Sequence, residues 1–341
     1  MSRSTNISLL AICVACSSCA PRIATSFWKI GTPADSIREG YAVLHEGKKM
    51  RHCYPITEWT DTMPNYVGKN DTYHSLHHHG VAVESELMAY RIYFDKKQTI
   101  DPYCKRKPQL ELAQSHWYPN DSLLAEGYGD DILRVSGTVG VGSVKYWNGK
   151  KHVHIEPVAE RSQRIVSSKK DQATIEVAVK GWQVEDKSVA MSTRYTMRAG
   201  HRDMRCDVLL SDTVSGLCTG VQAIPAKGPN QKSKILNLKL ENGVLLASWG
   251  TDWPVNDSAK YAKETVGLAV FIPKEYAGEI VQDKSNNLCL LKSQITNHKS
   301  QMCASAHFYL TCCGATKENH PVATSAEEWF IYLRRWAKHL R

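Results

Sequence analysis

Alternation of apolar and polar residues is the main pattern in the middle of the chain. In 173–185 every second residue from Ala173 to Val179 is apolar. Similar runs occur at 188–200, 204–210, 234–249 and 266–272. A period of two residues is typical of half-buried strands, and Glu-Asn-Gly at 241–243 is a hairpin turn signal. The pattern predicts a large antiparallel β-sandwich, and the lack of alternating strands and helices argues against a Rossmann fold or a TIM barrel.

The C-terminal segment 324–341 has a helical period instead. Ser325 and Glu328 have the spacing of a capping box. An apolar stripe follows at Trp329, Leu333, Trp336 and Leu340. A helix with one apolar stripe is expected to dock on the sandwich.

Two glycine-rich stretches are less regular. "GTVGVGSV" (137–144) looks like a strand whose glycines form bulges or let another segment approach closely. "GYGDD" (127–131) offers Asp130 and Asp131 to a calcium ion, but the sequence does not indicate the further ligands that such a site needs.

The N-terminus has the layout of a bacterial export signal. An early Arg3 precedes the apolar run 7–15, and small residues and cysteines follow. Cys16 and Cys19 each fit the lipidated position of a lipoprotein loosely, and the alternative is a cleaved signal without a lipid. We therefore expect residues 1–19 to be an export or lipoprotein signal. The protein is expected in the periplasm or outer membrane, with membrane contact only through the lipid anchor.

The remaining composition is that of a globular protein with a real core. Hydrophobic residues make up 42% of the chain and charged residues 23%. No repeat or low-complexity linker divides 20–341, so we expect a single domain there. The net charge of +9 comes from scattered Lys and Arg, which argues against a nucleic-acid partner and favours an acidic glycan or sugar ligand. Of eleven cysteines, three lie in the signal and eight beyond it. We expect mostly buried free thiols, with one or two disulfide bridges.

Histidines are concentrated in "YHSLHHHG", which begins at residue 73. An extended backbone would place His77 and His79 on one face and His78 on the other. Two histidines on one face could bind a divalent metal with a carboxylate such as Glu84. Without an HExxH motif we predict no cofactor and favour acid–base chemistry or hydrogen bonds to sugar hydroxyls. Surface or structural histidines are the alternative.

The next stretch, "ESELMAYRIYFD" (84–95), has no clean apolar face when read as one strand. Glu84, Glu86 and Tyr90 would share one side, and Arg91 would lie on the other. A sugar-binding face explains this, since carboxylates bind hydroxyls and arginine binds a uronate carboxylate through two hydrogen bonds. A cross-strand Arg–Glu pair on a solvated face is an equally good reading.

A second polar stretch is "AGHRDM", with His201, Arg202 and Asp203. A His–Asp pair can hold a catalytic imidazole, and Arg202 can neutralise an acidic substrate. A turn with local salt bridges is the alternative.

The third polar stretch, "SWGTDWPVNDSAKY", follows a strand pattern. Trp249 and Trp253 could stack on sugar rings, and Asp252 could bind hydroxyls. Lys260 and Tyr261 could meet a carboxylate or donate a proton. A long polar loop of this kind is usually functional.

The strings "YHSLHHHGVAVESELMAYRIYFDKKQTIDPY", "WYPNDSLLAEGYGDDILRVSGTVGVGSVKYWNG", "AGHRDM" and "SWGTDWPVNDSAKYAKETVGLAVFIP" together resemble an uncharacterised family of exported bacterial proteins, a domain of unknown function. The family occurs alongside enzymes that degrade pectin-like, uronate-rich glycans. The resemblance implies a galactose-mutarotase-like supersandwich. It supplies no catalytic residues, and fold analogy alone says little about function.

Three functions remain open. The first is an enzyme that acts on uronate-containing glycans by lyase-type proton abstraction. The second is a mutarotase-like sugar epimerase, and the third is a non-catalytic glycan-binding protein. We expect the His-rich run, the His-Arg-Asp stretch and the Trp-rich loop to surround one cleft. The predicted catalytic residues are His77, His78, His79, Glu84, His201 and Tyr261. The predicted substrate-binding residues are Glu86, Arg91, Arg202, Asp203, Trp249, Asp252, Trp253 and Lys260.

Overall fold

The structure is a computed structural model that describes residues 23–26, 41–45, 50–52, 77–112, 114–115, 118–169, 171–224, 234–255, 258, 261–298 and 301–340. The expected signal at 1–19 and Lys260 lie outside these residues, as does the side chain of His77. Within the described part of the chain, no helix is long and apolar enough to cross a membrane.

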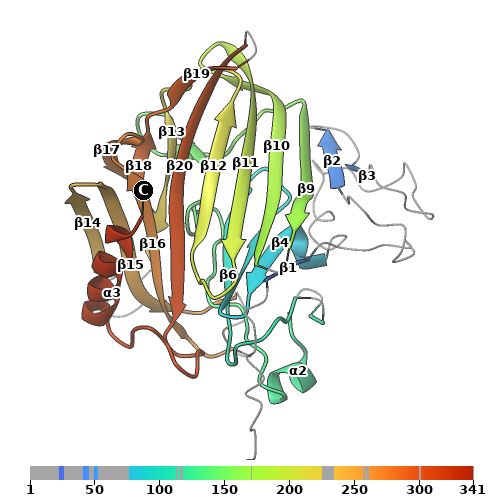
Figure 1. Cartoon of the computed structure of the whole chain (residues 1–341), viewed down its shortest axis with the longest axis vertical. Coiled ribbons are helices and arrows are strands. Elements are labelled where there is room, and N and C mark those ends of the chain that lie inside the picture. Colours follow the sequence, from blue (N-terminus) through green and yellow to red (C-terminus); the bar gives the residue numbers. More distant parts are fainter. Residues whose placement is uncertain are drawn as a thin grey trace, which may run out of the picture.

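The described chain forms antiparallel sheets (Figure 1). The large sheet has 11 strands, in the order β14-β15-β16-β20-β12-β11-β10-β9-β2-β3, with β19 paired to β20. Its strands are β2 (Tyr41–His45), β3 (Met50–His52), β9 (Glu160–Ser168), β10 (Gln172–Val184), β11 (Lys187–Arg198), β12 (Met204–Leu210), β14 (Lys234–Leu240), β15 (Gly243–Asp252), β16 (Glu264–Pro273), β19 (Gln294–His298) and β20 (Gln301–Gly314).

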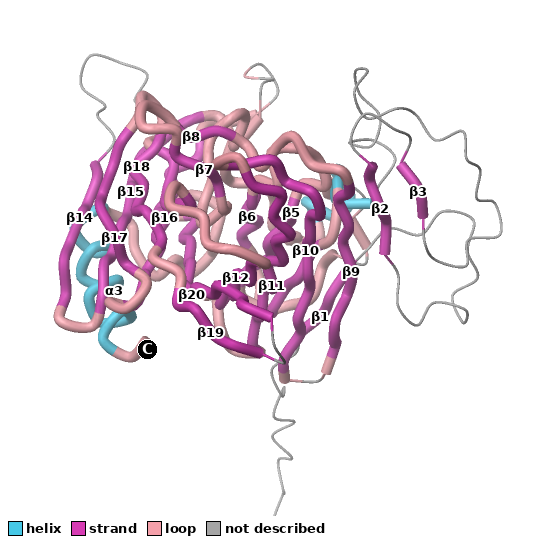
Figure 2. The backbone as a smooth tube through the Cα atoms, turned by 90° about the horizontal axis from the view of Figure 1, so that it is seen from above, coloured by secondary structure: helices cyan, strands magenta, loops and turns pink. Residues whose placement is uncertain are grey.

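Two smaller sheets cover one face of the large sheet. The four-stranded sheet consists of β1 (Ile23–Ser26), β4 (Ala82–Ser85), β5 (Met88–Ile92) and β6 (Ile100–Cys104). The five-stranded sheet consists of β17 (Ala277–Gln282), β18 (Asn286–Leu291), β13 (Leu217–Gln222), β7 (Lys145–Trp147) and β8 (His152–Val153). Figure 2 shows β5 to β8 on one side of β10, β11 and β12, and the main apolar core fills the space between these layers. The predicted all-β sandwich is confirmed.

The alternation predicted from the sequence is also confirmed. Ile175 and Val177 of β10, like Tyr195 and Met197 of β11, are almost fully buried in the core. The residues between them point to the outer face of the large sheet, where Glu176 accepts hydrogen bonds from two arginines. The turn at 241–242 joins β14 to β15, as its hairpin signal predicts.

The predicted C-terminal helix is α3 (Ala326–Lys338). The Ser325 hydroxyl accepts a hydrogen bond from the Glu328 amide, and the Glu328 carboxylate accepts one from the amide of Thr324. The helix packs on β15 and β16 on the outer face of the large sheet (Figure 1). Trp329 is fully buried there, and a Cβ at Gly267 would lie 2.6 Å from its ring, so this contact needs glycine.

The His-rich run is not extended. His77–His79 forms the 3₁₀ turn η2, and the backbone φ angles of His78 and His79 are 55° and 59°. Gly80 follows with a φ of 151°, and a Cβ there would lie 2.1 Å from the carbonyl oxygen of Ile92. Because this turn reverses the direction of the side chains, the face assignment made for an extended run is wrong.

The stretch 84–95 is not one strand either. It is a hairpin in which Glu86 and Leu87 form the turn between β4 and β5. The turn resets the two-residue period, so Glu84 shares a face with Ala89 and Arg91, and Tyr90 lies on the opposite face. This explains why no single apolar face was visible.

The stretch 137–144 is not a strand. It makes isolated bridges from Gly140 to Ile100 and from Val141 to Val221. A Cβ at Gly140 would lie 2.4 Å from the carbonyl oxygen of Ile100, so the close approach predicted from the glycines is confirmed. A short helix, α2 (Asp121–Ala125), precedes this irregular region.

The described cysteine side chains are buried thiols. They are Cys104, Cys206, Cys218, Cys289, Cys312 and Cys313. The side chains of the other two cysteines beyond the signal, Cys53 and Cys303, lie outside the described set.

Candidate functional site

The four-stranded sheet has an unusual outer face, which is polar and nevertheless buried. Glu84, Arg91 and Asp101 point away from the main core, and each is fully buried. The described residues of 109–118, which we call the covering segment, lie over this face, and Leu112 and Tyr118 among them belong to a small apolar cluster. Buried charges are costly unless they are paired, so the contacts among these groups determine whether the layer is stable.

Arg91 is the centre of this polar layer. Its guanidinium lies 2.5 Å from a carboxylate oxygen of Asp101, its direct cross-strand neighbour, and 3.8 Å from Asp131. The same group lies over the rings of Tyr103 and Tyr118, at 4.1 Å and 5.2 Å from their centroids. Arg91 is therefore held by carboxylates and aromatic faces without contact with solvent.

Two carboxyl groups share this one guanidinium. Burial raises the pKa of Asp101 and Asp131 above the ordinary aspartate range, and Arg91 only partly opposes this effect. For Asp131, the charge of Asp101 raises the pKa further. Because Arg91 is nearer to Asp101, we assign the retained proton to Asp131.

Asp131 also lies in the wall of a hollow of about 370 Å³, which we call the first hollow. Its lining comprises Tyr93, Lys97, Tyr118, Asp131, Leu133, Arg134, Val135, Ser136, Gly137, Pro254 and Val255. These residues come from the β5–β6 hairpin, from the segment before α2 that holds Tyr118, from the irregular stretch 131–137 and from the two residues that follow Trp253 after β15. The volume is at the small end of the range of about 300–1,000 Å³ that is typical of small-molecule sites.

Two cations line the first hollow together with Asp131. Arg134 lies 2.7 Å from Asp252, and Lys97 lies 3.5 Å from Asp95. The other carboxylate oxygen of Asp252 is buried and has no hydrogen-bond partner among the described residues. The Arg134–Asp252 pair joins two of the segments that form the wall.

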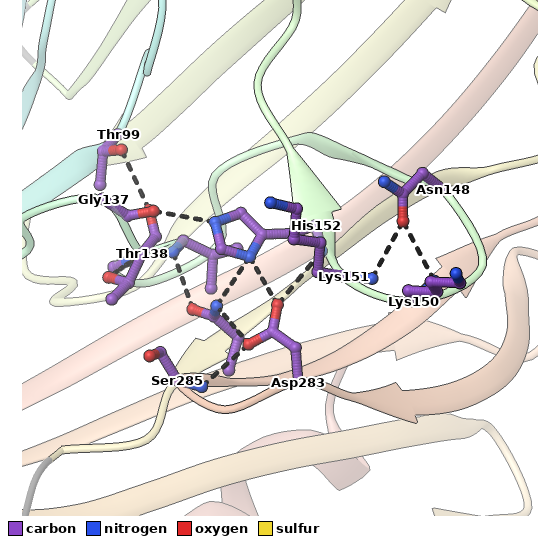
Figure 3. A network of polar contacts seen from close by, with 12 residues as sticks. Thr99, Gly137, Thr138, Asn148, Lys150, Lys151, His152, Asp283 and Ser285 are labelled. Atoms are coloured by element: carbon purple, nitrogen blue, oxygen red, sulfur yellow. Dashed lines mark hydrogen bonds and ion pairs between the residues drawn. The ribbon is translucent and has the colours of Figure 1, made fainter.

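The wall of the first hollow is fixed from behind by a polar network (Figure 3). One ring nitrogen of His152 donates to the carbonyl oxygen of Gly137 at 2.8 Å, and the other lies 2.6 Å from Asp283. Burial opposes ionisation of Asp283, but hydrogen bonds from His152 and from the Ser285 amide keep the pKa of this carboxyl below its usual range. Thr138 donates to the Gln222 side chain at 2.6 Å. The wall is therefore tied to the five-stranded sheet.

Lys145 supports the hairpin that carries Lys97. Its ammonium donates to the carbonyl oxygen of Lys97 and to the Thr99 hydroxyl. Burial lowers the pKa of Lys145 to about 7. The side chain is fully buried and does not line the first hollow, so these contacts indicate a supporting role.

Several residues predicted from the sequence lie beneath the first hollow rather than in its lining. The Glu84 carboxylate accepts hydrogen bonds from the amides of Glu111 and Leu112 and forms an ion pair with Lys105. His78 donates to the Leu112 carbonyl at 2.7 Å. These contacts hold the covering segment 109–118 in place.

His79 lies closer to the first hollow. Its ring packs against Tyr93 and Tyr118, with centroid distances of 5.7 Å and 6.2 Å. Both tyrosines line the first hollow, so His79 is in the position of a supporting group.

The His-Arg-Asp stretch lies elsewhere. His201 and Asp203 line a second hollow of about 270 Å³, formed by β11, β12, β20 and α3. Arg202 is buried and paired with Glu318. Tyr90 donates to the Arg202 carbonyl, and Glu86 accepts from the amide of Gly200. The structure therefore does not bring His201 into the cleft expected from the sequence, because β4 and β5 present their opposite side to this turn.

The Trp-rich stretch is a loop only in part, because its first residues up to Asp252 belong to β15, and the loop prediction is wrong for Trp249. Trp249 packs against Trp329 of α3, with ring centroids 6.5 Å apart. Trp253 carries the ammonium of Lys263 over its ring at 4.5 Å. The residues that follow, Pro254 and Val255, line the first hollow. Tyr261 is half-buried and is not part of that lining.

The residues of the first hollow that were not identified from the sequence as parts of a glycan site include Tyr93, Lys97, Tyr118, Asp131 and Arg134. The sequence feature that could have revealed this site is the hairpin 88–104. Once the register of its two strands is known, Arg91 lies opposite Asp101. Asp131 was noted only as a calcium ligand. Among the described residues, no group of three or more His, Cys, Asp or Glu side chains is arranged to hold a metal ion.

The sandwich and the first hollow together define an all-β protein with a polar site of small-molecule size. The chain belongs to a family described as a domain of unknown function (DUF4861), whose model matches residues 42–341. No curated protein matches the chain.

Proposed function

We propose that the protein binds a uronate-containing sugar in the first hollow and acts on it by acid–base chemistry. The observation that carries this proposal is Asp131, a buried carboxyl with a raised pKa in a hollow that also holds Arg134 and Lys97. A proton donor beside fixed cations is what an acidic substrate requires.

The first hollow has groups suited to each part of such a sugar. Arg134 can bind a carboxylate through two hydrogen bonds, and Lys97 adds a second positive charge. The rings of Tyr93 and Tyr118 offer apolar surface for the face of a sugar ring. Arg134 and Asp252 lie 2.7 Å apart. The ligand carboxylate would take the place of the Asp252 carboxylate as the partner of Arg134.

The proposed reaction is a β-elimination, the lyase-type proton abstraction expected from the sequence. A base removes the proton next to the uronate carboxylate, a carbon–carbon double bond forms, and the glycosidic oxygen leaves with a proton. We assign the base to Tyr93, whose hydroxyl can pass its own proton to Asp101 at 2.8 Å. Asp131 would protonate the leaving oxygen, and Arg134 would stabilise the charge that develops on the carboxylate.

A mutarotase-like sugar epimerase is the second candidate, because the first hollow is small enough to favour a single sugar unit. The same acid and base would then move a proton without breaking a glycosidic bond. The expected supersandwich and the expected association with pectin-like glycans are part of this proposal and fit both reactions. A non-catalytic glycan-binding protein would use the same cations and rings.

The test is incubation of the purified protein with uronic oligosaccharides, with absorbance of unsaturated uronate and product masses followed together. We expect Asp131→Asn and Tyr93→Phe each to reduce product formation at least about 100-fold, the lower range for loss of an acid or base. The matched controls are Asp212→Asn and Tyr128→Phe, which lie outside both hollows.

Because the proposed steps use side chains only, activity is expected to persist in a metal chelator. Binding without product would favour the glycan-binding protein, and a changed sugar of unchanged mass would favour the epimerase. Full activity of Asp131→Asn would contradict the assignment of the acid.

A further inference from the structure

The second hollow lies on the outer face of the large sheet, beside α3. Its lining includes Arg198, His201, Arg205, Tyr309, Trp336 and His339. None of its lining residues belongs to the first hollow, which is built on the four-stranded sheet and its loops. The two hollows are therefore separate sites.

Aromatic rings continue from the second hollow along β20. The ring of Tyr309 lies 5.8 Å from that of His307, which lies 4.6 Å from that of Tyr276. Trp336 lines the second hollow together with Tyr309. A row of partly exposed rings offers stacking surface over a length greater than that of a single small ligand.

The charges in the second hollow are mainly positive. Arg205 is paired with Asp207 at 2.7 Å and lies near the ring of Tyr309, and His201 lies 3.1 Å from Asp203. Arg198, by contrast, is exposed, and its guanidinium makes no hydrogen bond or ion pair with the described residues. Its guanidinium is available to an anionic ligand.

We propose that the second hollow and the adjoining aromatic row bind a chain of carboxylate-bearing sugars. The rings would stack on the sugar faces, and Arg198 and Arg205 would bind carboxylates. The class of ligand rests on the proposed function, whereas the separate location rests on the geometry of the second hollow alone. The site would hold a polymer on the protein while a shorter part of it occupies the first hollow, which raises the effective concentration there.

The test compares polygalacturonate with galacturonate monomer as probes. We expect the double variant Arg198→Gln, Arg205→Gln to bind the polymer about tenfold or more weakly, since each lost charged hydrogen bond affects affinity strongly. The matched control, Arg164→Gln with Lys180→Gln, removes two charges from the large sheet outside the second hollow. Equal effects of the two doubles, or no effect of either, would overturn the proposal.

Tyr309→Leu separates a sugar site from a simple anion site, because it keeps the charges and removes the ring. We expect weaker polymer binding with an unchanged melting temperature, and unchanged polymer affinity would overturn the sugar assignment. Product formation from short oligosaccharides should remain at the wild-type level in all these variants. If Asp131→Asn leaves product formation from short oligosaccharides intact, the proposed function is wrong. Polymer binding by the arginine and tyrosine variants still tests the second hollow independently.

Discussion

Two outer faces of the sandwich carry covers of opposite chemistry. On the large sheet, α3 covers β15 and β16 with apolar contacts centred on Trp329 and Leu333. On the four-stranded sheet, the covering segment lies over a layer of charged groups, and Glu84 and His78 hold it through Leu112. The first cover removes apolar surface from water, and that alone stabilises the fold.

The second cover has no such simple benefit. Burying Arg91, Asp101 and Glu84 costs free energy that pairing recovers only in part, and an apolar layer would often be as stable or more so. These buried charges lie next to the first hollow. Carboxyl groups with shifted pKa values are typical of functional sites. The contrast indicates that the apolar cover serves stability and the polar cover serves the site.

The largest effect is expected from removal of the apolar cover. Truncation that deletes 325–341 would expose Leu245, Ala269 and Phe271 to water. We expect a loss of more than about 5 kcal/mol, a large part of the total stability of a domain. Urea unfolding of the truncated chain checks this, and a truncated protein that unfolds like the full chain would contradict it.

Substitutions in α3 provide a finer control. Trp329→Ala is expected to cost about 3–5 kcal/mol because the buried ring leaves a cavity. Ile331 is 49% exposed, so Ile331→Ala should change stability by no more than about 0.5 kcal/mol.

The polar layer is expected to depend on Arg91. Arg91→Met leaves Asp101 and Asp131 without their shared cation in a buried site, and should cost about 3–5 kcal/mol. Arg164→Gln removes one half-exposed partner of Glu176 on the large sheet, and should cost at most about 1 kcal/mol. If urea unfolding showed equal losses of stability for Arg91→Met and Arg164→Gln, the stability of the polar layer would not depend on Arg91 as proposed.

The apolar cover was predictable from the sequence, and the polar cover was not. The period of α3 and the alternation of β10 and β11 depend on neighbours in the chain, so local patterns suffice. The polar layer depends on the two-residue turn at Glu86 and on positive φ angles at His78 and His79. Neither can be read from a hydrophobic pattern, and a shift of one residue exchanges the two faces of a strand.

The candidate site was accordingly predicted in part. The sequence pointed to Arg91 and to the loop after Asp252, and both lie at or beside the first hollow. It also pointed to His201, which is more than a hundred residues from Arg91 in the chain and was grouped with it by chemistry alone. Asp131 becomes notable only when β6 brings Asp101 near it, and such contacts between distant segments require the fold.

Release of the polar cover is expected to have an intermediate effect. Glu84→Gln keeps the shape of the side chain but weakens its bonds to the amides of Glu111 and Leu112 and removes the charge that pairs with Lys105. We expect a loss of about 1–3 kcal/mol, the range for an impaired buried hydrogen-bonding group. Hydrogen exchange should accelerate at the Glu111 and Leu112 amides more than in α3, and uniform acceleration would indicate global destabilisation instead.

The smallest effect has the opposite sign and concerns Asp131. Its pKa is raised in the folded state, mainly by burial and then by the charge of Asp101. Above about pH 4 an aspartate in the unfolded chain ionises, while the folded carboxyl keeps its proton. The folded state then binds more protons than the unfolded state, so this group's contribution to stability is full at lower pH and is lost as the pH rises toward the folded pKa.

Asp131→Asn removes that loss because an amide does not ionise. The variant should therefore be more stable than the wild type by on the order of 1 kcal/mol at neutral pH, with little gain below pH 4. Urea unfolding between pH 4 and 8 measures the difference, and Asp212→Asn, an exposed position, is the control that should show no such rise. A gain in stability together with a loss of product formation would assign the buried carboxyl to function, whereas a loss of stability at neutral pH would mean that Asp131 is ionised and paired with Arg91.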